Sequence, residues 1–254
     1  MIPTIPWYIT FVVIATNLAV AVIVWRIVSS ATGRSDLSSA SQRAVRTGSG
    51  LFLGAWFGAA LLLAPRPASI LHRDPFLLTP IIPILDAVPM AFALLAIWRS
   101  SSLRRVISAV PLPTLHGVQV YRAIGVVFVI LLIQGQLPAH FALPAGWGDV
   151  AIGLAAPLVA LALARSVPGA RPIAISWNVV GVLDLFVAVG MGTGFLASLL
   201  SASRVPAAAA MGVYPMILVP TFAVPVSMLL HFICLARLAR EAHEGARLVP
   251  TPAR

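Results

Sequence analysis

A series of long apolar runs, separated by short connectors that carry arginine, constrains this chain more than any other feature. A transmembrane helix needs about 20 apolar residues to cross a hydrocarbon layer of ~30 Å. With 60% hydrophobic and 9% charged residues, a soluble fold would expose too much apolar surface. The sequence therefore predicts an all-α membrane protein, a single transmembrane domain formed by a bundle of seven transmembrane helices. The predicted spans are residues 7–28, 49–64, 76–98, 117–137, 144–164, 173–196 and 214–236.

The basic residues predict the orientation of this bundle. The chain has 17 basic residues, all of them arginine. With seven spans, all but Arg66, Arg73 and Arg204 fall on one side of the membrane. Because cytoplasmic loops carry the excess of basic residues, the N-terminus is expected outside and the C-terminus in the cytoplasm. Residues 237–254 would then form a cytoplasmic basic tail that lies against the lipid bilayer.

Residue types that are missing exclude several functional classes. Without a lysine the chain cannot hold retinal as a Schiff base. The single cysteine, Cys234, permits no intramolecular disulfide, and no CxxCH pattern exists for a c-type haem. The net charge of +10 comes from arginines in short loops, which indicates membrane orientation rather than nucleic-acid binding. We therefore expect no cofactor, with a metal ion as the one option considered below.

Three carboxylates interrupt the apolar runs in the half of the membrane that is predicted to face outward. At 1.5 Å per residue, Asp149 lies roughly 8 Å, Asp184 roughly 14 Å and Asp86 roughly 15 Å below the outer boundary. Asn17 and Thr221 are their neutral companions at similar depth. A charged side chain in hydrocarbon is costly unless it is paired, hydrated or turned toward the bundle interior. These five residues are therefore the candidate binding site for a solute or a proton.

Two of the aspartates share a local pattern with small residues. Asp149 lies three residues after Gly146 and four before Gly153, and Asp184 lies three residues after Gly181. These steps keep the residues on one helical face, and a small-residue face lets two helices approach closely in lipid. We expect both aspartates to point toward the bundle axis. Whether they bind a ligand or only tie helices together remains open.

A second polar layer, consisting of Arg122, Asn178 and His231, lies roughly 8 Å from the predicted cytoplasmic boundary. Arg122 is long enough to reach the headgroups, and the alternative is a buried cation paired with Asp184 from below. His231 is either an imidazole that ties helices together or a proton carrier.

The connector at 134–149, rich in proline and glycine, is expected to line the mouth of a cavity, since irregular backbone at membrane depth needs protein or water around it. His140 in this connector is a candidate metal ligand together with His72 and Asp74, although their spacing matches no zinc signature. Prolines at 80, 83 and 89 and at 215, 220 and 225 predict kinks in the third and seventh spans.

Four short patterns are shared with a known group of sequences. They are Gln119-Val-Tyr-Arg122-x-x-Gly125, Leu-Pro-Ala-Gly-x-Gly-Asp149, Trp177-Asn178-x-x-Gly181-x-x-Asp184, and Pro220-Thr-x-x-x-Pro225 followed by His231. Over roughly its C-terminal half, the chain resembles an uncharacterised family of bacterial multi-span integral membrane proteins. The resemblance implies a place in the bacterial cytoplasmic (inner) membrane and no assigned activity, so it transfers no catalytic residue. The Pro-Gln pairs typical of seven-span sugar and amino-acid exporters are absent.

Three functions remain in competition. The first is binding or transport of a small solute, cation or proton in an outward-facing pocket lined by Asp86, Asp149 and Asp184, with a homodimer compensating for the small size of the chain. The second is an intramembrane enzyme, possibly dependent on a metal ion. The third is a membrane subunit or scaffold whose polar residues only specify how the helices pair.

Overall fold

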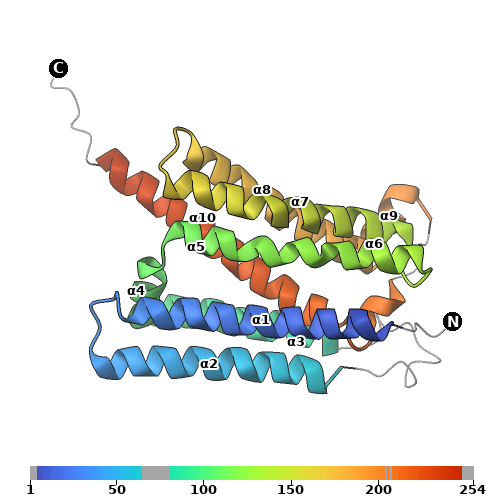
Figure 1. Ribbon diagram of the computed structural model, residues 1–254, viewed down its shortest axis with the longest axis horizontal. Coiled ribbons are helices and arrows are strands. Elements are labelled where there is room, and N and C mark those ends of the chain that lie inside the picture. Colours follow the sequence, from blue (N-terminus) through green and yellow to red (C-terminus); the bar gives the residue numbers. More distant parts are fainter. Residues whose placement is uncertain (1–4, 65–80, 204, 206–207, 248–254) are drawn as a thin grey trace.

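The computed structural model describes residues 5–64, 81–203, 205 and 208–247, and this part of the chain is helical without a strand (Figure 1). The main helices, in chain order, are α1 (Trp7–Thr32), α2 (Ser39–Leu62), α3 (Ile81–Arg99), α4 (Ser101–Ala109), α5 (Leu112–Gly117), α6 (Val126–Ile133), α7 (Ala139–Ala164), α8 (Ala170–Gly192), α9 (Phe195–Ser201) and α10 (Val224–Arg247). The 3₁₀-helices η2 (Val118–Gly125) and η3 (Ala209–Gly212) and the π-helix η4 (Val219–Ala223) connect some of them.

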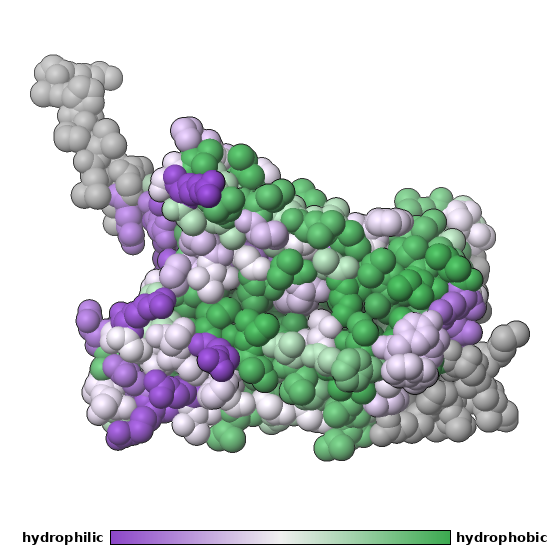
Figure 2. Space-filling view, viewed as in Figure 1, coloured by the Kyte–Doolittle hydropathy of each residue, from purple (hydrophilic) through white to green (hydrophobic). Residues whose placement is uncertain are grey.

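The length and apolar character of these helices suggest that the protein is embedded in a membrane. In the described part of the chain, six helices are long and apolar enough to cross one, and there are up to seven if α3 and α4 together make one bent span. Figure 2 shows an apolar band across the middle of the molecule, with hydrophilic residues gathered at the end that carries α4 and the C-terminus. Many large apolar side chains are exposed, as expected for a surface that contacts lipid.

The corner between α3 and α4 turns the chain sharply. The axes of the two helices meet at 95° around Ser100, whose hydroxyl accepts a hydrogen bond from the backbone N–H of Leu103 over 3.1 Å. A side-chain acceptor at this position satisfies one of the free N–H groups at a helix start, so Ser100 ends one helix and begins the next. Helix α4 therefore runs across the end of the bundle rather than continuing α3.

Helix α10 lies at the centre of the bundle. It packs against α8, α3, α5 and η4, and Figure 1 shows it running obliquely between the layer of α7 and α8 and the layer of α1 and α2. Helix α7 packs against α8, α5, η2 and α6, whereas α3 packs against η4, α10 and α4. This arrangement places α7 and α8 together on one side of α10 and α3 on another.

Two candidate spans contain turns that are not α-helical, η2 in the middle of one and η4 at the start of another. The 3₁₀-helix η2 lies so close to α7 that a Cβ atom at Gly153 would overlap the backbone of Ala123. The π-helix η4 contains Pro220 and is followed by Pro225, and neither proline has an N–H for the helical hydrogen-bond ladder. The sequence predicted a kink in the seventh span, and the structure has this π-helical turn there. Of the prolines in the third span, Pro89 lies inside α3 and Pro80 lies outside the described residues.

Several helices begin earlier than the predicted spans. Helix α2 begins at Ser39 rather than at residue 49, and the hydroxyl of Ser38 accepts from the N–H of Ser41 at its start. Helix α7 begins at Ala139 rather than at residue 144 and contains Pro144. The expectation that 139–149 is an irregular mouth of a cavity is therefore wrong, because Pro138 occupies the N-cap position and the helix continues from there. The apolar run misses the polar first turns of α2, whereas in α7 the predicted span began at Pro144, which the helix contains.

Candidate functional site: a buried arginine between two carboxylates

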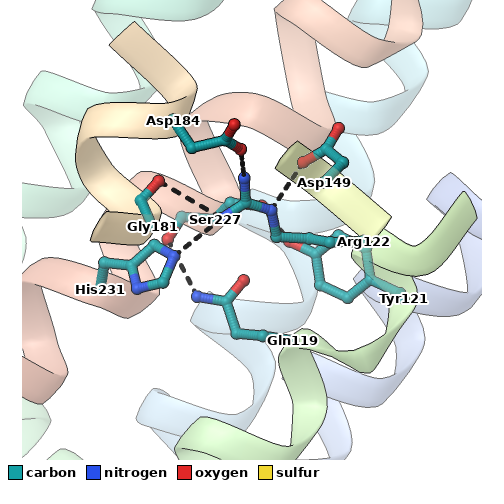
Figure 3. Close-up of polar contacts among 8 residues, drawn as sticks. All are labelled: Gln119, Tyr121, Arg122, Asp149, Gly181, Asp184, Ser227 and His231. Carbon is teal, nitrogen blue, oxygen red and sulfur yellow. Dashed lines mark hydrogen bonds and ion pairs between the residues drawn. The ribbon is translucent and has the colours of Figure 1, made fainter. Parts of the chain in front are cut away.

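Arg122 lies at the centre of a polar network in the interior of the bundle (Figure 3). Its side chain, which η2 holds in the interior, is only 2% exposed. The guanidinium Nε donates to Oδ1 of Asp149 on α7 over 2.7 Å, and Nη2 donates to Oδ2 of Asp184 on α8. Arg122 therefore does not extend to the headgroups, and the structure has the alternative in which it is a buried cation paired with Asp184.

The remaining guanidinium nitrogen, Nη1, faces α8 and α10. It donates to the carbonyl oxygen of Gly181 over 3.4 Å and lies 3.0 Å from Nε2 of His231. Because an arginine can only donate, Nε2 of His231 must be the acceptor and carries no proton. This assignment determines the direction of every hydrogen bond that follows.

A chain of hydrogen bonds continues from His231 away from the carboxylates. Nδ1 of His231 lies 2.9 Å from Oδ1 of Asn178, and Nδ2 of Asn178 lies 2.8 Å from Nε2 of His116. Nδ2 of Asn178 also donates to the carbonyl oxygen of Ala174, which identifies it as the nitrogen of the amide. His116 completes the chain with Nδ1 at 2.8 Å from the carbonyl oxygen of Leu112. Both imidazoles are therefore neutral in this arrangement, with their protons on Nδ1.

The backbone around this network has glycine where side chains approach most closely. A Cβ atom at Gly181 would overlap the ring of His231, and one at Gly148 would overlap the carboxylate of Asp184. A Cβ atom at Gly125 would overlap Cβ of Asp149. Of these three glycines, Gly181 belongs to a small-residue face predicted from the sequence, and it makes room for a polar side chain of another helix.

The charges in this network do not balance when both carboxylates are ionised. Arg122 supplies one positive charge, and Asp149 and Asp184 supply two negative charges. The side chains of these aspartates are 15% and 12% exposed. An unpaired charge in such surroundings costs several kcal/mol, by the general rule for buried ions. The arrangement is therefore suited to hold one further positive charge, either a proton on a carboxylate or a small cation.

A small cavity adjoins Asp149 and has room for such a guest. Its volume is about 40 Å³, enough for a few water molecules. Asn17 on α1 is 3% exposed and lines the cavity, and its Oδ1 has no hydrogen-bond partner in the described part of the chain. Tyr121 and Ser227 also line it, and their hydroxyl groups are hydrogen-bonded to each other over 2.5 Å. The cavity thus offers oxygen atoms from α1, η2, α7 and α10.

The predicted outer layer is only partly assembled in one place. Asp149, Asp184 and Asn17 lie at or near the cavity, whereas Asp86 and Thr221 do not line it. Asp86 is on α3, which packs against η4 and α10 rather than against α7, and it has no ion pair within the described residues. The hydroxyl of Thr221 donates to the carbonyl oxygen of Ile217 in its own helical turn. The cavity beside Asp149 is therefore not lined by all three aspartates.

The predicted inner layer, in contrast, is connected directly to the outer one. Arg122, Asn178 and His231 form one hydrogen-bonded chain, and the length of the arginine side chain joins it to both aspartates. The sequence placed these residues in two separate layers because their depths were estimated from Cα positions. Such an estimate does not include the length of the arginine side chain.

The suggested metal site can be followed for one ligand only. His72 and Asp74 lie outside the described residues. His140 is near the start of α7, and its Nε2 is buried without a partner within the described part. No group of three His, Cys, Asp or Glu side chains able to hold a metal ion occurs among the described residues.

Sequence reasoning missed His116, Tyr121 and Ser227 as members of this network. Ser227 lies four residues before His231, and this spacing places both on one face of α10. Tyr121 and Gln119 stand in the pattern around Arg122, and the amide nitrogen of Gln119 donates to the carbonyl oxygen of Ser227 over 3.4 Å. Spacing alone could therefore have grouped Ser227 with His231, but it could not have joined these residues to Gln119 and Tyr121.

Comparisons with known proteins give one family. No curated protein and no solved structure matches the chain. Residues 79–239 match the family described as a domain of unknown function, DUF8737. The match covers more than half of the chain and contains Arg122, both of its aspartates and His231. The chain therefore belongs to the DUF8737 family.

Proposed function

We propose that this protein binds a proton or a small cation at the carboxylates of Asp149 and Asp184 and carries it across the membrane. In this proposal, the protein is a seven-span bundle in a bacterial inner membrane, with the N-terminus outside and the C-terminus in the cytoplasm. One observation carries the proposal: a single buried guanidinium is shared between two carboxylates, which leaves one negative charge to be neutralised.

The size of the cavity beside Asp149 supports the proposal of a small ligand. Its volume of about 40 Å³ is too small for a sugar or an amino acid but is sufficient for a hydrated proton or a partly hydrated monovalent ion. The free Oδ1 of Asn17 and the hydroxyl oxygens of Tyr121 and Ser227 are neutral oxygen ligands. Such oxygens suit a hard cation.

The surroundings of the cavity support a change of conformation. Among the residues that line the cavity, Tyr121 and Arg122 belong to the 3₁₀-helix η2, and Val219 and Ala223 belong to the π-helix η4. Stretches of 3₁₀- and π-helix within a span often mark functional hinges. A cation bound between two such turns would favour one position of the turns over another. Alternating access requires such a coupling between binding and conformation.

The histidine chain is better suited to positioning than to proton conduction. Asn178 stands between His231 and His116, and its amide group does not readily release a proton to one imidazole while receiving one from the other. The neutral rings instead fix Nη1 of Arg122, and so fix the guanidinium between its two carboxylates. A bound proton would then leave through the cavity rather than along the histidines.

An enzymatic function lacks a comparable observation. Sγ of Cys234 lies 3.9 Å from Nδ1 of His116, but this nitrogen already donates to the carbonyl oxygen of Leu112. Cys234 is also fully buried. The imidazole therefore cannot act as a base toward the thiol in this arrangement.

The test is thermal unfolding of the detergent-purified protein across a series of pH values and a panel of monovalent cations, with choline as the inert salt. We compare the wild type with Asp149→Asn and Asp184→Asn, and use Glu241→Gln as the matched control. Glu241 is also a carboxylate that is paired with arginine, but it lies outside the network. We expect a rise in unfolding temperature on the order of 5 °C at a hundredfold excess of cation over Kd, or an acid-dependent rise of similar size.

Both Asp→Asn variants should lose this rise, and Glu241→Gln should keep it. In vesicles with an entrapped pH- or cation-sensitive dye, the wild type should conduct and the two variants should not. If the panel leaves the wild type unchanged and the variants are merely less stable, the carboxylates only tie the helices together and the proposal fails.

A further inference from the structure

A second cavity, separate from the arginine network, lies between α1, α2, α3, α4 and α10. We call it the apolar chamber. Its volume is about 520 Å³, in the range of ligand sites, and none of its lining residues lines the small cavity beside Asp149. Most of its lining side chains are aliphatic or aromatic, including Phe52 and Trp56 on α2, Phe92 on α3 and Leu229 on α10.

The chamber reaches from the core of the bundle to the surface that faces lipid. Trp56, at its inner part, is 3% exposed, whereas Phe92 is 57% exposed. The rings of Phe52 and Phe92 are stacked with their centroids 5.4 Å apart, and this stack joins α2 to α3. Gly48 also lines the chamber, and a Cβ atom there would meet nothing within 4 Å. A side chain added at Gly48 would therefore meet open space.

Helix α4 separates the chamber from a cluster of positive charges. Ser102, Leu103 and Ile107 face the chamber, while Arg104 and Arg105 line a polar depression on the other side of the helix. Arg34 and Arg240 complete this arginine cluster, and Asp36 is its one acidic neighbour among the residues that line the depression. None of the four arginines forms an ion pair within the described residues. Nη1 of Arg104 donates to the backbone carbonyl oxygens of Ile97 and Trp98 at the end of α3, so only its other guanidinium nitrogens are left for a ligand.

This arrangement matches the two ends of an amphiphile. A helix that lies across the end of the bundle with an apolar and a basic face is typical of the interface between hydrocarbon and headgroups. Serines at 41, 100 and 102 also line the chamber, and Ser100 and Ser102 lie at the start of α4. Arginine is particularly suited to phosphate because of its planar set of donors.

We propose that the protein binds an anionic phospholipid at this site, with one acyl chain in the apolar chamber and the phosphate at the arginine cluster. The chamber supplies an apolar lining that a hydrocarbon chain fills. The cluster supplies an excess of unpaired positive charge that favours an anionic over a zwitterionic headgroup. The inference is independent of the proposed transport function, because the two sites share no lining residue.

The test uses quenching of tryptophan fluorescence by brominated acyl chains. A protein variant that keeps Trp56 and has the other five tryptophans changed to Phe is placed in mixed micelles. The micelles contain brominated phosphatidylglycerol or brominated phosphatidylcholine. A chain that keeps only Trp177 is the control, since Trp177 is also buried but packs against His116 and His231. We expect Trp56 to be quenched strongly and Trp177 weakly, with phosphatidylglycerol effective at a several-fold lower mole fraction.

Two sets of variants test the binding of the acyl chain and the binding of the headgroup separately. Gly48→Leu places a side chain in the open part of the chamber and improves helix propensity, so it should fold and yet abolish the quenching of Trp56. Arg105→Gln with Arg240→Gln should weaken phosphatidylglycerol binding by about fivefold per arginine and leave phosphatidylcholine unchanged. Arg165→Gln, an exposed arginine after α7, should change neither.

The proposal is overturned if Trp56 is quenched no more than Trp177, or if Gly48→Leu folds and leaves the quenching unchanged. If both lipids quench Trp56 equally and the arginine variants do not change the quenching, the headgroup is not bound at the arginine cluster. The proposal of an anionic lipid is then overturned. Folding of each variant is checked by its elution from size-exclusion chromatography.

Discussion

His231 accepts a hydrogen bond from Arg122 through Nε2, with the two nitrogens 3.0 Å apart inside the bundle. An arginine has no acceptor, so the contact requires an imidazole without a proton on Nε2. On its other side, Nδ1 of His231 lies 2.9 Å from the carbonyl oxygen of the Asn178 side chain. The ring is thus held in one tautomer by a cation on one side and an amide oxygen on the other.

The first prediction is the tautomer itself. In ¹⁵N NMR spectra of the protein in bilayers near neutral pH, His231 and His116 should both be neutral, with the proton on Nδ1. The His231→Gln and His116→Gln variants assign the two signals. A protonated His231, or one with its proton on Nε2, would mean that Arg122 does not donate to it and would contradict the network.

The second prediction concerns the central cation. Arg122→Gln leaves Asp149 and Asp184 without a partner in the interior, so we expect the free energy of unfolding to fall by about 3–5 kcal/mol. Combining it with Asp149→Asn and Asp184→Asn removes the two charges as well and should recover more than half of the loss. Unfolding in mixed micelles measures both changes.

The matched control is Arg171→Gln. Arg171 also forms an ion pair, with Glu241, but its side chain is 56% exposed. Exposed pairs of this kind contribute about 0–1 kcal/mol, so the control should remain close to the wild type. A loss at Arg122 no larger than that at Arg171 would show that the buried network adds little to stability.

The helical class and the buried polar residues could be predicted from the sequence because both follow from local patterns. Apolar runs of near-membrane length indicate helices, and a charge inside such a run is costly wherever it lies. The partners of each charge could not be predicted in the same way. Asp86 and Asp149 are both predicted to lie in the outer half of the membrane, yet they lie on helices that pack against different neighbours.

The direction of the Arg122 side chain could not be predicted from the sequence either. Its Cα position alone was compatible with a side chain in the headgroups or in the interior, because the side chain is long enough for both. The choice depends on glycines that belong to other helices: Gly148 leaves space for Asp184, and Gly181 leaves space for His231. Such complementarity between helices has no signature within one helix, and so only the assembled bundle reveals it.

The third prediction uses that complementarity. Gly181→Ala places a methyl group against the ring of His231, which is held by Arg122 and Asn178 and cannot move without losing those hydrogen bonds. Overpacking of this kind typically costs about 1–3 kcal/mol. We expect a lower unfolding temperature in detergent and an altered ¹⁵N signal of His231.

Gly54→Ala is the control for this substitution. It is also a glycine within a helix, but a Cβ atom there meets nothing within 4 Å. Alanine favours a helix over glycine by about 0.5–1 kcal/mol, so this variant should be as stable as the wild type or slightly more stable. Equal effects of the two substitutions would show that His231 does not occupy the space beside Gly181.

The fourth prediction concerns the indole of Trp56, which joins three helical segments. Its N–H lies 2.9 Å from the carbonyl oxygens of both Leu85 on α3 and Thr221 on η4. The residue itself belongs to α2 and is 3% exposed. The carbonyl oxygen of Thr221 belongs to the π-helical turn, where the regular ladder of hydrogen bonds is interrupted. The indole therefore provides a donor at a place where the backbone of a broken helix needs one.

Trp56→Phe keeps an aromatic ring and removes this donor. Leaving a buried acceptor without a partner costs about 1–3 kcal/mol, and we expect a loss of that size in the free energy of unfolding. Trp147→Phe is the control, since Trp147 is 54% exposed and should tolerate the change. Hydrogen exchange should also become faster in the segment around η4, because the turn loses its link to α2. If Trp56→Phe is as stable as Trp147→Phe and exchange is unchanged, the π-helical turn does not depend on the indole.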